Sequence, residues 1–376
     1  MRILQVVEFF SPVHGGSAMV PYYVSRELVK RGHEVTVFTS DYKLSQEWAK
    51  SLRQVKVYPF KTRLSWAKFY ITPDITKHTK EGIKRFDLIH MHNYRSFQNL
   101  VVHHYAKKYG VPYVLQAHGS LPTIMAKQRL KRIYDVFFGY RLLRDASKMI
   151  ALSPVEAEQY RRMGVPEEKI AIIPNGIDLS EYANLPPKGS FKKKFGIKEE
   201  EKIVLYLGRI HKIKGVDILV KAFANVIKKL DNIRLVIVGP DDGYLSELRA
   251  LIKALRIENK VIIAGPLYGR DKLEAYVDAD VYVLPSRYEI WGITFLEALA
   301  CGTPVILTEN CGIAEYFRDK AGLVVKPDSN HLGEALLEML LNQDKQKVFR
   351  ENCKTVMQKF NISETVSKLE KVYQEL

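Results

Sequence analysis

A strand, a polar loop and a helix start follow one another over residues 280–306, and this pattern constrains the fold more than any other stretch. Residues 280–284 are apolar enough for an interior strand, the loop ends at Gly292, and helix-forming residues follow. Gly302-Thr303-Pro304 then ends the helix and begins the next strand. Repeats of strand and helix build α/β domains, in which ligands bind outside the carboxyl ends of the parallel strands.

Two acids stand on this stretch, Glu289 in the loop and Glu297 on the helix, with seven residues between them. The backbone amides of Ile290, Trp291 and Gly292 lie at the expected helix N-terminus, where N–H groups donate to hydroxyl or anionic oxygens. A carboxylate pair beside such amides suits a polyhydroxylated ligand. The alternative is that both acids are ordinary solvated charges.

The stretch resembles the signature of the retaining glycosyltransferases of family 4, in which two glutamates have this spacing. The resemblance implies the GT-B fold, with two Rossmann-like doubly wound domains facing each other across a cleft and a C-terminal helix returning to the first domain. It also implies that Glu289 contacts the donor sugar and that Glu297 contacts the ribose of the nucleotide. The resemblance extends over the whole chain.

The composition is that of a soluble globular protein, with 47% hydrophobic and 27% charged residues. No apolar run has the length of a membrane-spanning helix, and residues 1–4 lead straight into a strand, so we expect a cytoplasmic protein. Three cysteines are too few for a disulfide framework. The net charge of +16 indicates an anionic partner, and charge alone does not choose among nucleic acid, a membrane surface and phosphorylated substrates.

The first βαβ unit occupies residues 3–39, with Gly15 and Gly16 in the loop between its first strand and its helix. Two glycines allow the backbone to approach a phosphate closely, although a Gly-Gly pair is also common in tight turns. In the resembling family this loop closes over the donor diphosphate or shapes the acceptor site.

Polar residues follow the later strands of the same domain. His118 comes after the fifth strand, and Asn175 comes after the last one. A lone histidine at a strand end is often only a hydrogen-bonded structural group, whereas the family resemblance implies that His118 contacts the donor sugar. We expect both residues at the active face of the domain.

Residues 127–144 interleave basic side chains with aromatic and aliphatic ones, from Lys127 to Arg144. Such a segment either lies at an anionic membrane surface or is an ordinary amphipathic helix with a solvated basic face. The resemblance adds that many relatives act on lipid-linked acceptors at the cytoplasmic membrane face. Peripheral association with that membrane is therefore one expectation.

The second half of the chain opens with a strand at residues 203–207, and Arg209 and Lys214 follow in the loop before the next helix. A strand, a basic loop and a helix N-terminus together suit phosphate oxygens. The resemblance implies that both cations neutralise the diphosphate leaving group. It also implies that the nucleotide base is held near Gly239 and Leu267.

These patterns predict an N-terminal acceptor-side domain over residues 1–183, to which a helix over about residues 360–376 returns. Proline, glycine and charge without periodicity indicate a linker over residues 184–202. The nucleotide-sugar-binding domain is then expected over residues 203–359.

The predicted function is transfer of a sugar, with retention of configuration, from a nucleotide-diphosphate sugar to a hydroxyl acceptor, which is a glycan, a lipid-linked molecule or a small molecule. The expected catalytic residues are His118, Arg209, Lys214 and Glu289. We expect a UDP- or GDP-sugar as the donor and no cofactor. No metal is expected either, because no acid-rich cluster completes a ligand shell around the histidines.

Two alternatives remain open at this point. The first is a nucleotide-sugar epimerase or hydrolase with the same fold, which would consume the donor without an acceptor. The second is a basic module that binds a membrane or nucleic acid. A specific nucleic acid partner is not expected, because the sequence contains no recognisable RNA- or DNA-binding motif.

Overall fold

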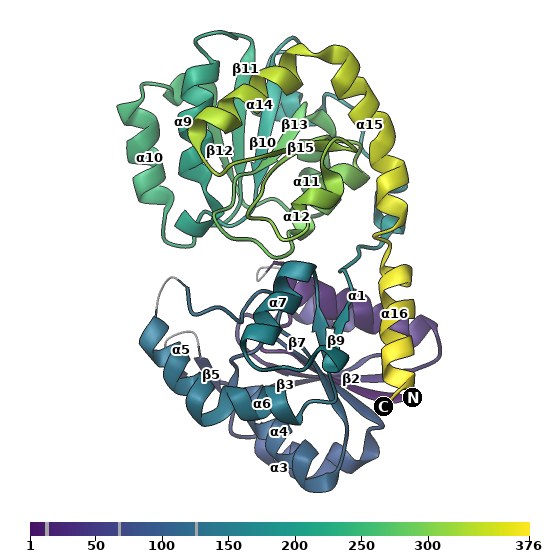
Figure 1. The fold of residues 1–376 in the computed structure, drawn as a ribbon. Coiled ribbons are helices and arrows are strands. Elements are labelled where there is room, and N and C mark those ends of the chain that lie inside the picture. Colours follow the sequence, from purple (N-terminus) through teal and green to yellow (C-terminus); the bar gives the residue numbers. More distant parts are fainter. Residues whose placement is uncertain (12–14, 67–68, 125–126) are drawn as a thin grey trace. The chain divides into compact units, whose positions relative to one another are not determined.

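The computed structural model describes residues 1–11, 15–66, 69–124 and 127–376, which form two compact units (Figure 1). Unit 1 contains Met1–Ile177 and Ile362–Leu376, and unit 2 contains Asp178–Asn361. Each unit is built on its own parallel sheet, with helices between successive strands. The predicted α/β class with two Rossmann-like domains is confirmed.

The described part of unit 1 contains a seven-stranded sheet with the order β3-β2-β1-β6-β7-β8-β9, in which all pairs are parallel. The chain runs outward from β1 to β3 and then continues on the other side of β1 with β6, so the topological switch point lies between these two strands. The strands are β1 (Arg2–Val6), β2 (Glu34–Ser40), β3 (Lys56–Phe60), β6 (Leu88–His92), β7 (Tyr113–Gln116), β8 (Lys148–Ala151) and β9 (Ile170–Ile172).

The central strands of this sheet are buried on both faces, as parallel strands covered by helices must be. A core of aliphatic and aromatic side chains, including Ile89, Leu115 and Met149, lies between the sheet and its helices. The helices are α1 (Gly16–Lys30), α2 (Gln46–Ser51), α3 (Ile75–Gly82), α4 (Phe97–Tyr109), α5 (Gln128–Tyr134), α6 (Tyr140–Asp145), α7 (Pro154–Arg162) and α16 (Ile362–Gln374).

A short antiparallel hairpin in unit 1 is absent from the sequence-based prediction. It consists of β4 (Leu64–Trp66) and β5 (Phe69–Ile71). Three-residue strands carry too little periodicity to stand out in a sequence. The hairpin is fastened by packing, since Phe69 contacts Phe97 of α4 and Tyr134 of α5 edge-on, with ring centroids 6.4 and 6.2 Å apart.

Unit 2 has a six-stranded sheet in its described residues, with the order β12-β11-β10-β13-β14-β15 and parallel pairing throughout. Its switch point lies between β10 and β13, because the chain moves outward from β10 to β12 and then crosses to β13. The strands are β10 (Lys202–Leu207), β11 (Ile233–Val238), β12 (Val261–Gly265), β13 (Val281–Leu284), β14 (Val305–Thr308) and β15 (Gly322–Val325).

The helices of unit 2 cover this sheet and close its core, in which Phe223, Leu235 and Leu336 are fully buried. The strongly apolar helix α9 packs against α14 beside the central strands. The helices are α8 (Ser190–Phe195), α9 (Val216–Val226), α10 (Leu245–Ala254), α11 (Gly269–Asp278), α12 (Ile293–Ala300), α13 (Ala314–Phe317), α14 (Ser329–Leu341) and α15 (Gln343–Gln358).

Residues 184–202, which the composition indicates as a linker, are packed into unit 2. Phe191 is buried, and the backbone N–H of Lys192 donates to Asp278 Oδ2 at the end of α11 (2.9 Å). Arg234 on β11 donates to Glu201 (2.7 Å). Prolines and charges give this segment the composition of a linker, while a few long-range contacts hold it against the domain.

The final helix α16 belongs to unit 1, as the resemblance implies, and lies alongside α1 (Figure 1). Arg31, which follows α1, donates to Glu370 (2.7 Å) and to the backbone oxygen of Ser363 (2.8 Å). The hydroxyl of Tyr373 forms a hydrogen bond with His90 on β6 (2.7 Å). The chain end is therefore fixed to both the helical layer and the sheet of unit 1.

Candidate functional site

The switch point of unit 2 brings together two loops that the sequence singles out. The loop after β10 carries Arg209 and Lys214, and the loop after β13 carries Glu289. Because β10 and β13 are neighbours in the sheet, their carboxyl ends present both loops at one edge. This is the position at which open α/β sheets bind ligands.

Lys214 and Glu289 form an ion pair at this edge, and their side chains are only 16% and 13% exposed. A Lys ammonium carries three donors, so Lys214 can bind a second acceptor while it contacts Glu289. Arg209 is paired with Asp242 and is 45% exposed, which leaves part of its guanidinium open to solvent. The two loops thus place the Lys214–Glu289 pair and the Arg209–Asp242 pair at the same edge of the sheet.

Two glycines allow the loops to approach the neighbouring strand ends. A Cβ atom at Gly215 would lie 1.9 Å from the backbone oxygen of Pro285, and the residue has φ of 67°. A Cβ atom at Gly239 would lie 1.9 Å from the backbone oxygen of Gly208. No other residue fits either position without a backbone shift. The packing of the loop therefore requires glycine at position 239, which the resemblance also places near the nucleotide base.

An ion pair that the sequence does not reveal joins the loop after β13 to the start of α9, which follows the other loop directly. Both terminal nitrogens of Arg287 donate to the carboxylate of Asp217, at 2.7 Å each. The backbone N–H of Arg287 also donates to the oxygen of Ile213 (2.8 Å). Together these bonds hold the two loops that carry Lys214 and Glu289 against each other.

Glu297 on α12 is buried and already has two partners on α11. Lys272 donates to its Oε1 (2.7 Å), and the hydroxyl of Tyr276 donates to its Oε2 (2.9 Å). Each carboxylate oxygen has a second lone pair, so further acceptor capacity remains for a ribose hydroxyl. Sequence reasoning missed Lys272 and Tyr276, because their spacing from Glu297 follows from the packing of two helices.

The start of α12 contains the predicted amide donors. Gly292 is its N-cap residue, and no side chain caps this helix end. Ile290 and Trp291 are buried, and the indole of Trp291 packs on Phe360 with ring centroids 5.7 Å apart. The Gly292 amide lies beside the thiol of Cys311, whose pKa is raised to about 12, chiefly by burial. Leu267, in the loop after β12, is partly exposed.

In unit 1, His118 follows β7 with a left-handed backbone, φ of 52°. Few non-glycine residues adopt this conformation without a functional or packing constraint. The constraint is visible at the next residue, whose N–H donates to Glu156 Oε1 (2.6 Å), while Leu152 N–H donates to Oε2 (2.8 Å). Burial raises the pKa of Glu156 to about 7, although both amides act in the opposite direction.

The other predicted residues of unit 1 lie at the same edge of its sheet. Asn175 is buried, and its side-chain oxygen accepts from Gln116 at the end of β7 (3.0 Å). Gly15 has φ of 69° and is the N-cap residue of α1, and Gly16 is the first residue of that helix. The carboxyl end of the sheet therefore carries His118, Asn175 and the Gly-Gly turn together.

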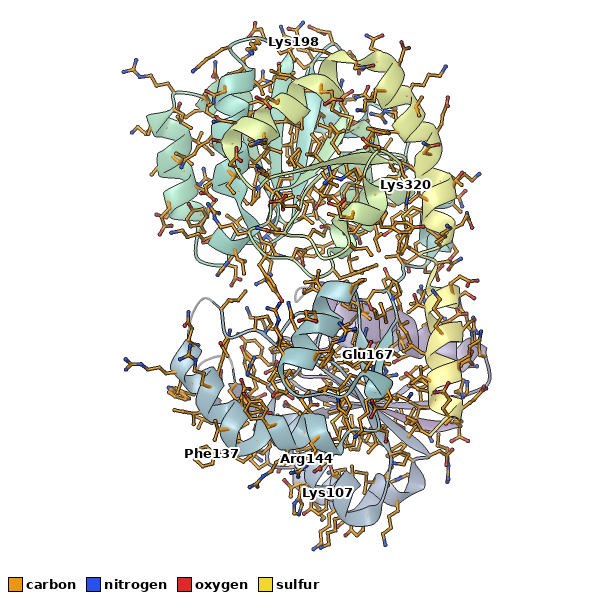
Figure 2. The ribbon with its side chains drawn as sticks, viewed as in Figure 1. Lys107, Phe137, Arg144, Glu167, Lys198 and Lys320 are labelled. Atoms are coloured by element: carbon orange, nitrogen blue, oxygen red, sulfur yellow. The ribbon has the colours of Figure 1, made fainter. Side chains whose placement is uncertain are left out.

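The basic and aromatic segment forms α5, a π-helical turn over Asp135–Gly139, and α6. Its apolar side chains remain largely outside the core: Val136 is 64% exposed and Phe137 is 61% exposed. Figure 2 shows Phe137 projecting away from the rest of unit 1. No described helix is long and apolar enough to cross a membrane, and no cluster of three potential metal ligands occurs among the described residues.

Two family models together match most of the chain. Residues 14–181 match "Glycosyltransferase Family 4", and residues 187–356 match "Glycosyl transferases group 1". The two matches correspond closely to the main bodies of units 1 and 2. Both sheets with their switch-point loops thus lie within the matched regions.

Individual proteins give the same result. An uncharacterized glycosyltransferase of Methanocaldococcus jannaschii is 30% identical over 87% of this chain and 85% of its own length. An alpha-monoglucosyldiacylglycerol synthase of Streptococcus pneumoniae is 29% identical over 91% and 78%, respectively. The crystal structure of Anabaena HepE in complex with UDP-glucose has a TM-score of 0.84 at 21% identity and full coverage of both chains. The chain therefore belongs to the family 4 glycosyltransferases and has the GT-B fold.

Proposed function

We propose that this protein transfers a sugar from a UDP- or GDP-sugar to a hydroxyl acceptor, with retention of configuration and without a metal ion. The observation that carries the proposal is the presence of two cations, Arg209 and Lys214, at the switch point of unit 2, where Lys214 pairs with Glu289. Cations aimed at a diphosphate stabilise the charge that develops as it leaves. A UDP-sugar is the first candidate, since HepE, which shares the fold, was crystallised with UDP-glucose.

In the proposed reaction, the acceptor oxygen forms a bond to the anomeric carbon while the bond from that carbon to the diphosphate oxygen breaks. The hydroxyl proton passes to the departing diphosphate, so no further base is required. Arg209 and Lys214 receive the negative charge, Glu289 and His118 orient the sugar, and Glu297 binds the ribose. Catalysis then depends on positioning and electrostatic stabilisation.

A panel of nucleotides tests the donor assignment. We expect thermal stabilisation by UDP or GDP and by the matching nucleotide sugar in buffer that contains EDTA, because a ligand of the folded state raises its midpoint. Stabilisation only after a divalent cation is added would contradict metal independence. No stabilisation by any member of the panel would favour the basic binding module.

Turnover separates the transferase from an epimerase or hydrolase. The donor should be consumed only when a hydroxyl acceptor is present, and the product should keep the anomeric configuration of the donor. Lys214→Ala is expected to lower kcat by about 100-fold. Lys212→Ala is the matched control, since Lys212 lies in the same turn and is exposed. Equal losses in both variants would remove the assignment of Lys214.

The exposed segment over α5 and α6 supports a second part of the proposal, an acceptor at an anionic membrane surface. Val136 and Phe137 are exposed next to Arg132 and Arg141, a combination suited to a membrane interface. One relative reported above is named for a product that contains diacylglycerol. A lipid-linked acceptor would bring its hydroxyl to this surface.

Vesicle binding tests the membrane surface directly. Vesicles of phosphatidylcholine with phosphatidylglycerol should sediment the protein at low salt, and binding should weaken with ionic strength. Val136→Ser with Phe137→Ser should reduce binding, whereas Val155→Ser, at a site that is 48% exposed on α7, should not. Equal binding of the wild type, the double variant and Val155→Ser would show that the segment is an ordinary solvated amphipathic face.

A further inference from the structure

Polar side chains fill the interior of unit 1 at its switch point, where aliphatic residues would be expected. Gln5 on β1 and His90 on β6 stand opposite each other in the strand register, and both are fully buried. His92, two residues along β6, is also fully buried and stacks on His90 with ring centroids 4.1 Å apart. Buried polar groups are costly unless they are hydrogen-bonded, so their arrangement calls for an explanation.

The hydrogen bonds connect this interior to the candidate sugar-binding residue. His118 Nε2 lies 2.9 Å from His92 Nδ1, and the two rings are nearly parallel, with an interplanar angle of 13°. His92 Nε2 in turn contacts the side-chain oxygen of Gln5. Three residues from β1, β6 and the loop after β7 therefore form one chain of hydrogen bonds.

The chemistry of these groups determines where the protons lie. An amide oxygen only accepts, so His92 must carry a proton on Nε2 in order to donate to Gln5. A neutral imidazole has one donor and one acceptor, which makes His92 Nδ1 an acceptor. His118 must then donate from Nε2, and its Nδ1 carries a lone pair.

The surroundings keep both rings neutral. Burial lowers the pKa of His118 to about 3 and lowers that of His92 well below its ordinary value.

We propose that Gln5 and His92 act as positioning residues that hold His118 in a single neutral tautomer, with its Nδ1 available to accept a hydrogen bond from a hydroxyl of the donor sugar. This inference rests on the proposed function, in which His118 contacts that sugar. The bond from Gly119 to Glu156 fixes the backbone beside the ring, and the bond from His92 fixes the ring itself. Arginine or lysine at this position would only donate, whereas this His118 tautomer accepts.

The tautomer is measurable in the wild-type protein, and one variant is needed only to assign its signal. Two-bond correlations between ring protons and ¹⁵N distinguish Nε2–H, Nδ1–H and doubly protonated imidazoles, and His118→Asn assigns the signal. At pH 7 we expect a neutral His118 with its proton on Nε2. A proton on Nδ1, or a doubly protonated ring, would overturn the proposal.

Gln5→Met tests the positioning role, because methionine has a similar shape and lacks the amide. We expect loss of the single tautomer. We also expect the ratio of the affinity for the nucleotide sugar to the affinity for the free nucleotide to fall about ten-fold. Tyr373→Phe is the control: the hydroxyl of Tyr373 bonds His90 (2.7 Å), which is not part of the chain from Gln5 through His92 to His118, so this variant should leave the tautomer and this ratio unchanged. An unaltered tautomer and ratio in Gln5→Met would contradict the inference.

These experiments distinguish failure of the positioning role from failure of the proposed donor site. If the wild type binds no nucleotide sugar, the proposed donor site fails, while the tautomer measurement still reports on Gln5 and His92. If the wild type binds and turns over a nucleotide sugar, and Gln5→Met matches it, only the positioning role fails.

Discussion

Gly215 shows how much a single residue contributes at the switch point of unit 2. Its left-handed backbone and its contact with Pro285 both depend on the missing side chain. Gly215→Ala should destabilise the protein by at least about 2 kcal/mol, the cost of a left-handed alanine plus that of moving the backbone away from Pro285. Denaturant unfolding measures this, and nucleotide binding should weaken too, because Lys214 is the adjacent residue.

Gly243→Ala is the matched control for that substitution. Gly243 has φ of 85°, and a Cβ atom there would meet no atom within 4 Å. It should therefore cost only the conformational part, about 1 kcal/mol, and leave nucleotide binding unchanged. Similar losses in the two variants would show that the contact with Pro285 has no energetic weight.

Glu8, just after β1, is a buried carboxylic acid that the sequence does not single out. It is 7% exposed, and its Oε1 has no hydrogen-bond partner among the described residues. Burial raises its pKa to about 8. Tyr70 and Tyr134 lie close enough for its charge to raise the pKa of each phenol further, although burial is the main cause.

Glu8→Gln should change how stability depends on pH. Between about pH 5 and pH 8 the unfolded chain loses the Glu8 proton while the folded protein keeps it, so this group reduces stability as pH rises. The variant has no such proton to lose. Its free energy of unfolding should therefore rise relative to that of the wild type by on the order of 2–4 kcal/mol between pH 5 and pH 8. Urea unfolding at several pH values measures the difference. A difference that is constant with pH would show that Glu8 ionises normally in the folded protein.

At the scale of elements, Arg31 makes several of the hydrogen bonds that hold α16 against α1. Its guanidinium donates to Ser363, Ser367 and Glu370, and this side of unit 1 is only partly exposed to solvent. Arg31→Ala should lower stability by about 2 kcal/mol, since hydrogen bonds to charged groups are among the stronger ones. It should also speed amide hydrogen exchange in α16 before other helices are affected.

Arg162→Ala provides the comparison on α7 of the same unit. Arg162 is 77% exposed and pairs with Glu158 at the surface, so its removal should change little. Unchanged exchange in α16 of the Arg31 variant would indicate that apolar packing, including that of Leu369, holds the helix without it.

The elements are largely predictable from the sequence because each depends on local patterns. The strand expected at residues 203–207 is β10, and the strand expected at 280–284 is β13. The segment at 184–202 is the main exception, since its burial depends on Asp278, far along the chain. Composition indicates the local conformational preference of a segment, whereas tertiary contacts decide whether it packs against a domain.

For the candidate site, the sequence predicts the positions of the main residues but not the partners that hold them. The positions of Lys214, Glu289 and His118 at strand ends follow from the alternation of strands and helices, and the structure places them there. Their partners do not follow, because Gln5 meets His92, the partner of His118, only through the order of the strands in the sheet. Sequence spacing carries no signal for contacts of this kind, and the roles of the site residues stay predictions.

At the scale of the whole molecule, the reactivity of the three cysteines can be used to measure the opening of unit 2 separately from unit 1. Cys301, Cys311 and Cys353 all lie in that unit, and each is buried. Burial raises the pKa of every one of these thiols, to about 12 for Cys311 and Cys353. Thiolates, the reactive form, are therefore scarce in the folded protein.

A thiol reagent should react slowly with the native protein, at a rate set by the opening of unit 2. A nucleotide that binds unit 2 should slow labelling further, because it stabilises the closed form. Absorbance of the released reagent measures the rate, and fully denatured protein gives the limiting value. A thiol that reacts in native buffer at the rate of a free cysteine would contradict the burial of these residues.

The hydrogen bond between Ile362 N–H and the oxygen of Ile177 (2.9 Å) has a consequence for protein engineering. The chain leaves unit 1 after Ile177 and re-enters it at Ile362, so both junctions lie side by side on that unit. In genetic terms, unit 2 is an insertion into a single loop of unit 1. A gene that replaces residues 178–361 with a short glycine-containing turn would encode the complete sheet of unit 1 together with α16, Tyr373 and the buried histidines.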